Sequence, residues 1–198
     1  MPPEPVRRPA LILLFGGPAA GKGTQAHLLS DALSFPHISS GDLLRDHQRR
    51  AAQAVMERGD LLPDDLVSEV VFARLGEPDA VPGAVLDGFP RTLSQAEALD
   101  LWLQQKGGGV RAALSLEVPP DQLLERAISR GEVSHREDDH VESARRRVAV
   151  FLQELPPVLE HYAARGLLHW IDGTRSIDLV HAQILKALGK PAAQLAEE

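Results

Sequence analysis

A glycine-rich segment near the start of the chain has the composition of a phosphate-binding loop. Residues 16–24 read GGPAAGKGT, which fits G-x-x-x-x-G-K, although Gly23 stands where serine or threonine is usual. Backbone N–H groups of such a loop wrap phosphate oxygens, and Lys22 adds a mobile charge. The apolar segment before the loop and the helical pattern after it favour this interpretation over a turn with an incidental lysine. We expect a nucleoside triphosphate to bind the loop through Gly16, Pro18, Ala19, Ala20, Gly21, Lys22, Gly23 and Thr24.

A second motif, DGFPR over residues 87–91, follows a brief apolar segment. Its glycine and proline force a turn at the end of the predicted strand, and this turn would direct Arg91 into a cleft. A guanidinium group suits a phosphate dianion, which it can bind through two parallel hydrogen bonds. Asp87 would end its strand close to the phosphate loop. We expect it to hold Mg²⁺ through water, as acidic residues after a strand do in P-loop enzymes.

These motifs need a scaffold, and the apolar pattern predicts one in which strands alternate with helices. We expect strands over residues 10–15, 84–87, 112–118 and 167–171. We expect helices over residues 23–33, 41–58, 63–75, 92–105, 121–130, 141–165 and 176–188, the sixth bent or interrupted near Pro156 and Pro157. This alternation indicates an α/β fold with a parallel sheet. Segments 39–69 and 131–141 do not fit it and are predicted to be insertions over the strand ends, where ligands bind.

Composition narrows the function classes. The 198 residues are 43% hydrophobic and 25% charged, which suits one globular domain. The absence of cysteine excludes disulfides, thiolate zinc sites and cysteine nucleophiles. A net charge of −7 disfavours duplex DNA and anionic membranes as partners. The histidines show no zinc-binding spacing. The first residues do not resemble a signal peptide, so we expect a cytoplasmic protein.

Five segments, in order along the chain, resemble the adenylate kinase family in its short-lid form. They are GGPAAGKGTQ, HISSGDLLR (37–45), LDGFPRTLSQA (86–96), RAISRG (126–131) and HREDDHVESARRR (135–147). The resemblance extends from Leu11 to Leu188. It implies a P-loop, three-layer α/β/α domain over residues 1–198 with a parallel sheet. It also implies a small helical insertion over residues 39–69 that binds the nucleoside monophosphate, and a short lid over residues 131–141.

The resemblance also implies roles for individual residues. The catalytic cations would be Lys22, Arg91, Arg126, Arg130, Arg136 and Arg147. ATP would contact the loop together with Arg126, Arg130 and Arg175. AMP would contact Ser40, Arg45, Asp60, Leu61, Leu62, Gly88, Phe89, Pro90, Arg91, Gln95, Arg136 and Arg147.

Several of these roles have a physical basis or an alternative. The amide of Gln95 can donate and accept at once, as an adenine edge requires. Ser40 suits both AMP binding and a helix N-cap. Asp42 is a weaker Mg²⁺ candidate than Asp87. Arg145 and Arg146 are expected on a basic helix surface, and Asp138 and Asp139 are expected to latch the lid.

The reaction implied is Mg²⁺-dependent, reversible transfer of the γ-phosphoryl group of ATP to AMP, giving two ADP, by a monomer. A UMP/CMP kinase on the same scaffold is the nearest alternative, and Asp42 and Gln95 favour AMP. A non-catalytic nucleotide-binding regulator is the second alternative, and it would be expected to lack some of the arginines that this chain retains. One departure stands out: Ala19 occupies a position where the family usually has glycine, and its Cβ restricts the loop.

Overall fold

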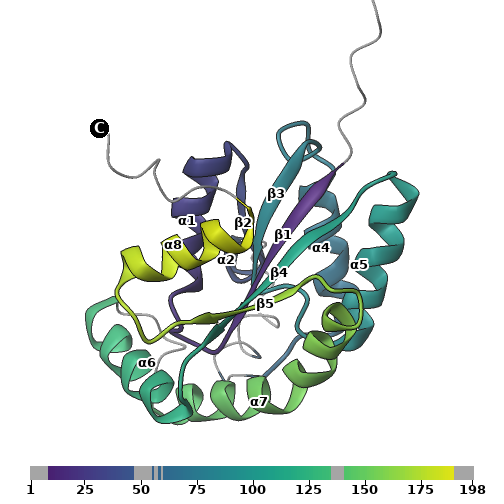
Figure 1. The fold of residues 1–198 in the computed structure, drawn as a ribbon. Coiled ribbons are helices and arrows are strands. Elements are labelled where there is room, and N and C mark those ends of the chain that lie inside the picture. The colour runs from purple at the N-terminus through teal and green to yellow at the C-terminus, as the bar shows by residue number, and fades with distance from the viewer. Residues whose placement is uncertain (1–8, 47–54, 56–57, 59, 135–140, 190–198) are drawn as a thin grey trace, which may run out of the picture.

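The computed structural model describes residues 9–46, 55, 58, 60–134 and 141–189. Within these residues the chain forms a five-stranded sheet in the order β2-β3-β1-β4-β5 (Figure 1). The strands are β1 (Ala10–Gly16), β2 (His37–Ser39), β3 (Gly83–Asp87), β4 (Gly109–Glu117) and β5 (Leu168–Asp172). All four neighbouring pairs are parallel. The predicted parallel α/β fold is therefore confirmed.

Helices cover both faces of the sheet. They are α1 (Lys22–Leu33), α2 (Ser40–Asp46), α4 (Asp64–Leu75), α5 (Leu93–Gln105), α6 (Pro120–Ser134), α7 (Val141–Ala163) and α8 (Ile177–Ala187). Helices α1 and α8 lie on one side, and α4 and α5 lie on the other (Figure 1). None of the described helices is both long and apolar enough to cross a lipid bilayer.

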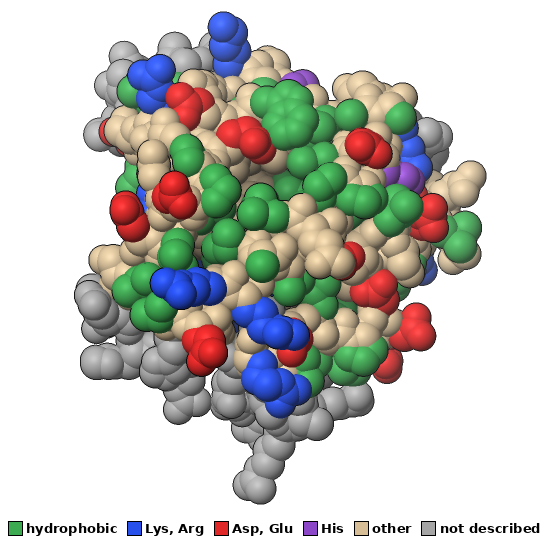
Figure 2. All heavy atoms as spheres, turned by 90° about the horizontal axis from the view of Figure 1, so that it is seen from below, with side chains coloured by type: hydrophobic (Ala, Val, Ile, Leu, Met, Phe, Trp, Pro, Cys, Tyr) green, Lys and Arg blue, Asp and Glu red, His purple; other side chains and the backbone are tan. Residues whose placement is uncertain are grey.

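Strand β1 sits at the centre because both of its faces are apolar. Leu11 and Leu13 pack into a core with α4, α5 and α7, whereas Ile12 and Leu14 pack into a second core with α1 and α8. A strand alternates its side chains between the two faces, so an uninterrupted apolar run fills both cores at once. On the surface, acidic and basic side chains surround a central apolar area on the face shown in Figure 2.

The structure corrects four boundaries. Strand β2 was not predicted, since a three-residue strand shows too little alternation to recognise. Strand β4 begins at Gly109, earlier than predicted. Helix α6 continues to Ser134, into the predicted lid, and residues 135–140 lie outside the described residues. Helix α7 is not interrupted: it includes Pro156 and Pro157. Burial of its apolar face offsets the hydrogen bonds that these prolines remove.

The phosphate loop connects β1 to α1 through unusual backbone angles. Gly21, the N-cap of α1, has φ +96°, and Ala19 has φ +59°. The left-handed region costs a residue with a Cβ about 1–2 kcal/mol. Ala19 therefore folds into the loop under local strain, as its departure from glycine led us to expect.

Replacing this alanine tests the strain. Ala19→Gly should raise the free energy of unfolding by about 0.5–1 kcal/mol, because relief of the strain exceeds the added chain entropy of glycine. Urea denaturation measures the change. Ala20→Gly is the matched control, since Ala20 is in the same loop but is not among the positive-φ residues, and it should destabilise. Equal destabilisation by both changes would contradict the strain.

Candidate active site

A cavity of about 600 Å³ opens at the carboxyl ends of β1 and β3. Neighbouring parallel strands end at the same edge of a sheet, so the loops after them meet there. The cavity brings together most of the predicted site: Gly16, Pro18, Ala19, Ala20, Gly21, Lys22, Gly23, Thr24, Arg45, Asp60, Leu61, Asp87, Gly88, Pro90, Arg91, Arg126, Arg130 and Arg147. Two motifs that lie far apart in the sequence therefore form one site.

Lys22 lies at the centre of the charge in this cavity. Its Nζ donates hydrogen bonds to the carbonyl oxygens of Gly16 and Gly17, both at 2.9 Å. The pKa of Lys22 is lowered to about 8, mainly by burial; Asp87 opposes this lowering, and Arg91, Arg130 and Arg147 add to it. The ammonium is held across the loop in a setting that disfavours its charge. An anion bound there would restore that charge.

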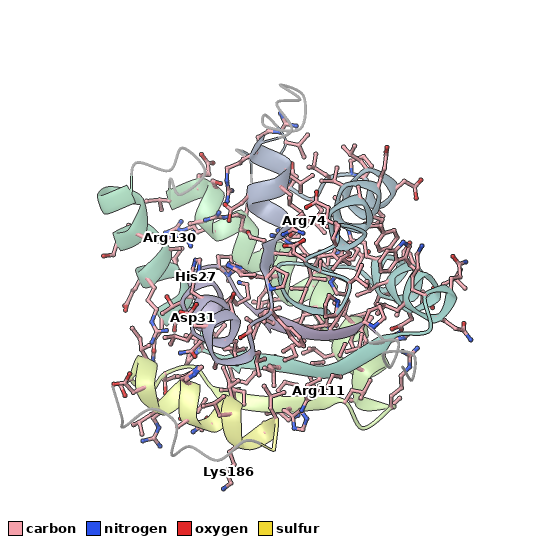
Figure 3. The ribbon with its side chains drawn as sticks, turned by 90° about the horizontal axis from the view of Figure 1, so that it is seen from above. His27, Asp31, Arg74, Arg111, Arg130 and Lys186 are labelled. Atoms are coloured by element: carbon pink, nitrogen blue, oxygen red, sulfur yellow. The ribbon has the colours of Figure 1, made fainter. Side chains whose placement is uncertain are left out.

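Three arginines approach the lysine from different elements. Arg91 follows β3, Arg130 is on α6 (labelled in Figure 3) and Arg147 is on α7, and all three depress the pKa of Lys22. Like charges so close together repel one another, and a polyanion between them removes the repulsion. The geometry is that of a site for phosphate groups.

Gly88 fixes the direction of Arg91. Its carbonyl accepts hydrogen bonds from Arg91 Nε at 2.8 Å and from Ser40 Oγ at 2.7 Å. Its φ is +79°, and an added Cβ would lie 2.9 Å from Ser40 Oγ. Glycine at this position thus allows the turn and the close approach of both side chains.

The cap of α2 differs from the expectation. Ser39 Oγ accepts the Asp42 N–H at 3.3 Å, whereas Ser40 is buried and donates to Gly88. The prediction that Ser40 caps this helix is wrong, because its side chain points toward the turn after β3. Arg45 lines the cavity with its Nη2 2.5 Å from Asp42 Oδ1.

Asp87 lines the cavity beside the phosphate loop and could hold Mg²⁺ through water. Its side chain is 14% exposed, and its Oδ2 lies 3.8 Å from His37 Nε2. Burial raises the pKa of Asp87, but His37, Lys22 and Arg91 outweigh burial, so the pKa lies below its usual value. The group therefore stays an anionic oxygen ligand, which suits Mg²⁺.

The described residues hold no cluster of three or more histidine, aspartate or glutamate side chains arranged to bind a metal ion. Mg²⁺ differs from zinc in keeping several waters and relying on substrate phosphates. One carboxylate beside the phosphate loop is thus a sufficient protein contribution to it.

Other predicted residues lie at the edge of the cavity or behind it. Arg126 donates to the Gly173 carbonyl at 3.1 Å, and Arg175 Nε lies 2.9 Å from Asp172 Oδ2. Phe89 and Leu62 are buried in the hydrophobic core. Arg136, Asp138 and Asp139 lie outside the described residues.

Gln95 is also behind the cavity wall. It is only 2% exposed, its Oε1 accepts the Arg91 N–H at 2.8 Å, and its Nε2 donates to Asp64 Oδ1 at 2.7 Å. The amide thus supports the backbone of Arg91 and has one N–H and one lone pair left for another partner.

Sequence reasoning missed several residues of the cavity. His27 and His37 line it (His27 is labelled in Figure 3). No motif contains His27, and His37 begins the segment HISSGDLLR but was given no role there. Phe151 and Leu155 also line it, and they follow Arg147 at four-residue steps on α7, a spacing that could have identified them. Arg146, expected on a basic surface, pairs with Asp60.

Comparison with known proteins agrees with this geometry. The family model described as adenylate kinase matches residues 14–167. An adenylate kinase of Thermus thermophilus is 42% identical over 184 residues, which cover 90% of this chain and 96% of that protein. The adenylate kinase of Nocardia farcinica is 44% identical over 185 residues, covering 90% and 99%. That of Xanthomonas euvesicatoria pv. vesicatoria is 43% identical with the same coverage. A phosphate loop and an arginine turn in one cavity, and relatives matched along nearly their whole length, establish that the chain belongs to the adenylate kinase family.

Proposed function

We propose that this enzyme transfers the γ-phosphoryl group of ATP to AMP, reversibly and with Mg²⁺, giving two ADP. One observation carries the proposal: the phosphate loop with Lys22 and the turn with Arg91 line the same cavity, and their charges act on each other. Two nucleotides can therefore place their phosphates side by side. The names of the relatives support adenine nucleotides as substrates.

On the donor side, the loop N–H groups and the α1 N-terminus bind the triphosphate, and Lys22 moves from the loop carbonyls to its outer oxygens. Arg130 and Arg147 neutralise the same charge from α6 and α7. Arg126 lines the same cavity and donates to the Gly173 carbonyl, and we propose that it joins these cations on the phosphates.

On the acceptor side, Arg91 and Arg45 hold the AMP phosphate as charge-assisted pairs. Arg45 first exchanges its contact with Asp42 for the substrate. The segment 39–69 then provides the AMP side, with Leu61 lining the cavity near the base. Gln95 is 2% exposed and lies behind the cavity wall, so it reads the adenine with its remaining N–H and lone pair after binding of AMP opens that wall.

The chemistry is an in-line displacement. An oxygen of the AMP phosphate forms a bond to the γ-phosphorus while the bond from that phosphorus to the β,γ-bridging oxygen breaks, so both products are ADP. The acceptor oxygen is already ionised near pH 7, and no general base is required. Lys22, Arg91, Arg130 and Arg147 stabilise the charge on the equatorial oxygens. Asp87 would hold Mg²⁺ through water, and the bound ion would further neutralise the phosphates.

We propose that the enzyme works as a cytoplasmic monomer on free nucleotides rather than on nucleic acid or membranes. The net charge of −7 supports free nucleotides over nucleic acid and anionic membranes, and the absence of cysteine suits the cytoplasm. The monomer is proposed from the family alone.

Acceptor choice tests the proposal directly. We expect rapid ADP formation from ATP and Mg²⁺ with AMP, little with UMP, CMP, GMP or no acceptor, and none with EDTA. Preference for UMP or CMP would keep the phosphate site and overturn the base assignment. Tight ATP binding without turnover on any acceptor would favour the regulatory alternative.

Arg91→Ala tests the role of Arg91 at the AMP phosphate. It should lower kcat/KM for AMP by roughly 10²–10⁴-fold, because a charge-assisted contact to the transferred group is lost. Arg74→Ala is the matched control: Arg74 lies on α4 outside the cavity, paired with Asp79, and its loss should leave kcat/KM within about twofold of wild type. A folded Arg91→Ala enzyme with near-normal kinetics would refute the role.

The lowered pKa of Lys22 predicts that activity declines at alkaline pH. Because that pKa is lowered to about 8, the free enzyme loses the ammonium charge as the pH rises through this value, and kcat/KM for ATP should fall there. Bound phosphates favour the charged form, so kcat should decline only at higher pH. Initial rates between about pH 6 and 10 measure both limbs, with AMP well below its KM for kcat/KM and with both substrates saturating for kcat. A flat kcat/KM across this range would contradict the role of burial.

A further inference from the structure

The first turn of α5 is joined to the start of α4 by a single carboxylate. Asp64 Oδ1 accepts from Gln95 Nε2 at 2.7 Å, and Asp64 Oδ2 accepts from Thr92 Oγ1 at 2.8 Å. Thr92 in turn caps α5, since its Oγ1 accepts the Gln95 N–H at 3.2 Å. Asp64 therefore contacts both the cap of the helix and the side chain assigned to read the base.

The two partners of the Gln95 amide leave it one orientation. An ionised carboxylate only accepts, so Asp64 requires the NH₂ end of the amide. The Arg91 N–H only donates, so it requires the oxygen end at 2.8 Å. Reversing the amide would place donor against donor and acceptor against acceptor. The remaining N–H and lone pair are thus presented in a fixed arrangement.

A fixed amide distinguishes bases that a rotating amide does not. Adenine offers a donor at its 6-amino group next to an acceptor at N1, and hypoxanthine offers the reverse, an acceptor at O6 next to a donor at N1. A free amide turns over and pairs with either. An amide held at both ends pairs well with only one of these two bases.

We infer that Asp64 is a positioning residue that sets acceptor-base selectivity by holding the Gln95 amide in one orientation. This inference rests on the proposed reading of adenine by Gln95. Asp64 also lies just after the cavity residues Asp60 and Leu61, so the same carboxylate connects the acceptor segment to the helix that follows Arg91.

The test compares AMP with IMP as acceptors. Wild type should favour AMP in kcat/KM, and Asp64→Ala should lower the AMP-to-IMP ratio by roughly tenfold, the loss of one hydrogen bond to a charged group. The effect should appear mainly in KM for AMP, with KM for ATP within about twofold of wild type. A merely structural role would lower the melting temperature without changing this ratio, so rates are taken well below that temperature.

Three variants complete the design. Asp64→Asn should keep the ratio, because its carbonyl accepts from Gln95 while the Thr92 hydroxyl rotates to accept from its NH₂. Asp65→Ala, an exposed carboxylate one residue along α4, should leave the ratio unchanged. Asp64→Ser keeps a residue that suits a helix start but is too short to reach Gln95, and it replaces Asp64→Ala if that variant does not fold.

The outcomes separate the two proposals. If wild type does not favour AMP over IMP, Gln95 does not read adenine and the base assignment fails. If wild type favours AMP and Gln95→Leu removes the preference, yet folded Asp64→Ala or Asp64→Ser retains it, the positioning role alone is overturned. An AMP-to-IMP ratio for Asp64→Asn as low as that for Asp64→Ala would also overturn the positioning role. The oxygen that accepts the Gln95 hydrogen bond would then not be what sets the ratio.

Discussion

The site depends on one constraint, the burial of a positive charge in a cavity that also holds three arginines. Lys22 shares the space with Arg91, Arg130 and Arg147, and Asp87 is the carboxylate that offsets them at the lysine. Burial disfavours the charged form of Lys22 and is the main reason that its pKa falls to about 8, and the three arginines add to this lowering. The arrangement is unfavourable when empty and favourable around phosphates. Bound phosphates would relieve both the burial penalty on the lysine and the repulsion between the cations.

The parallel sheet holds these charged residues close together. Strands β1 and β3 are neighbours in register, with Leu14 beside Asp87, so the phosphate loop and the arginine turn leave the sheet together. The apolar run of β1 anchors both helical layers, and shifting it would displace the loop. Helices α6 and α7, which pack against each other, bring the other two arginines across the strand ends. Each charge thus depends on a different element, and the core determines their separation.

Local patterns were enough to predict much of this. The phosphate loop, the turn before Arg91 and the alternation of elements are visible in short windows, because each depends on residues close in sequence. Contacts over long separations were not predictable. Asp64 and Gln95 are 31 residues apart and Arg146 and Asp60 are 86 apart, and neither pair has a local signature. The Ser39 cap was missed because Ser40 suits a cap equally well, and only the position of the Gly88 carbonyl distinguishes them. Pro156 and Pro157 led to a wrong prediction, because packing of α7 overrides the low helix propensity of proline.

The central claim is that donor and acceptor phosphates meet in one cavity and exchange the phosphoryl group directly. The stereochemical course at phosphorus tests it, using ATP made chiral at the γ-phosphorus with oxygen isotopes and one turnover to AMP. A single in-line displacement predicts inversion of configuration. Retention would indicate two displacements through a phosphorylated side chain, with His27 and His37 at the cavity wall as the first places to look, and it would contradict direct transfer.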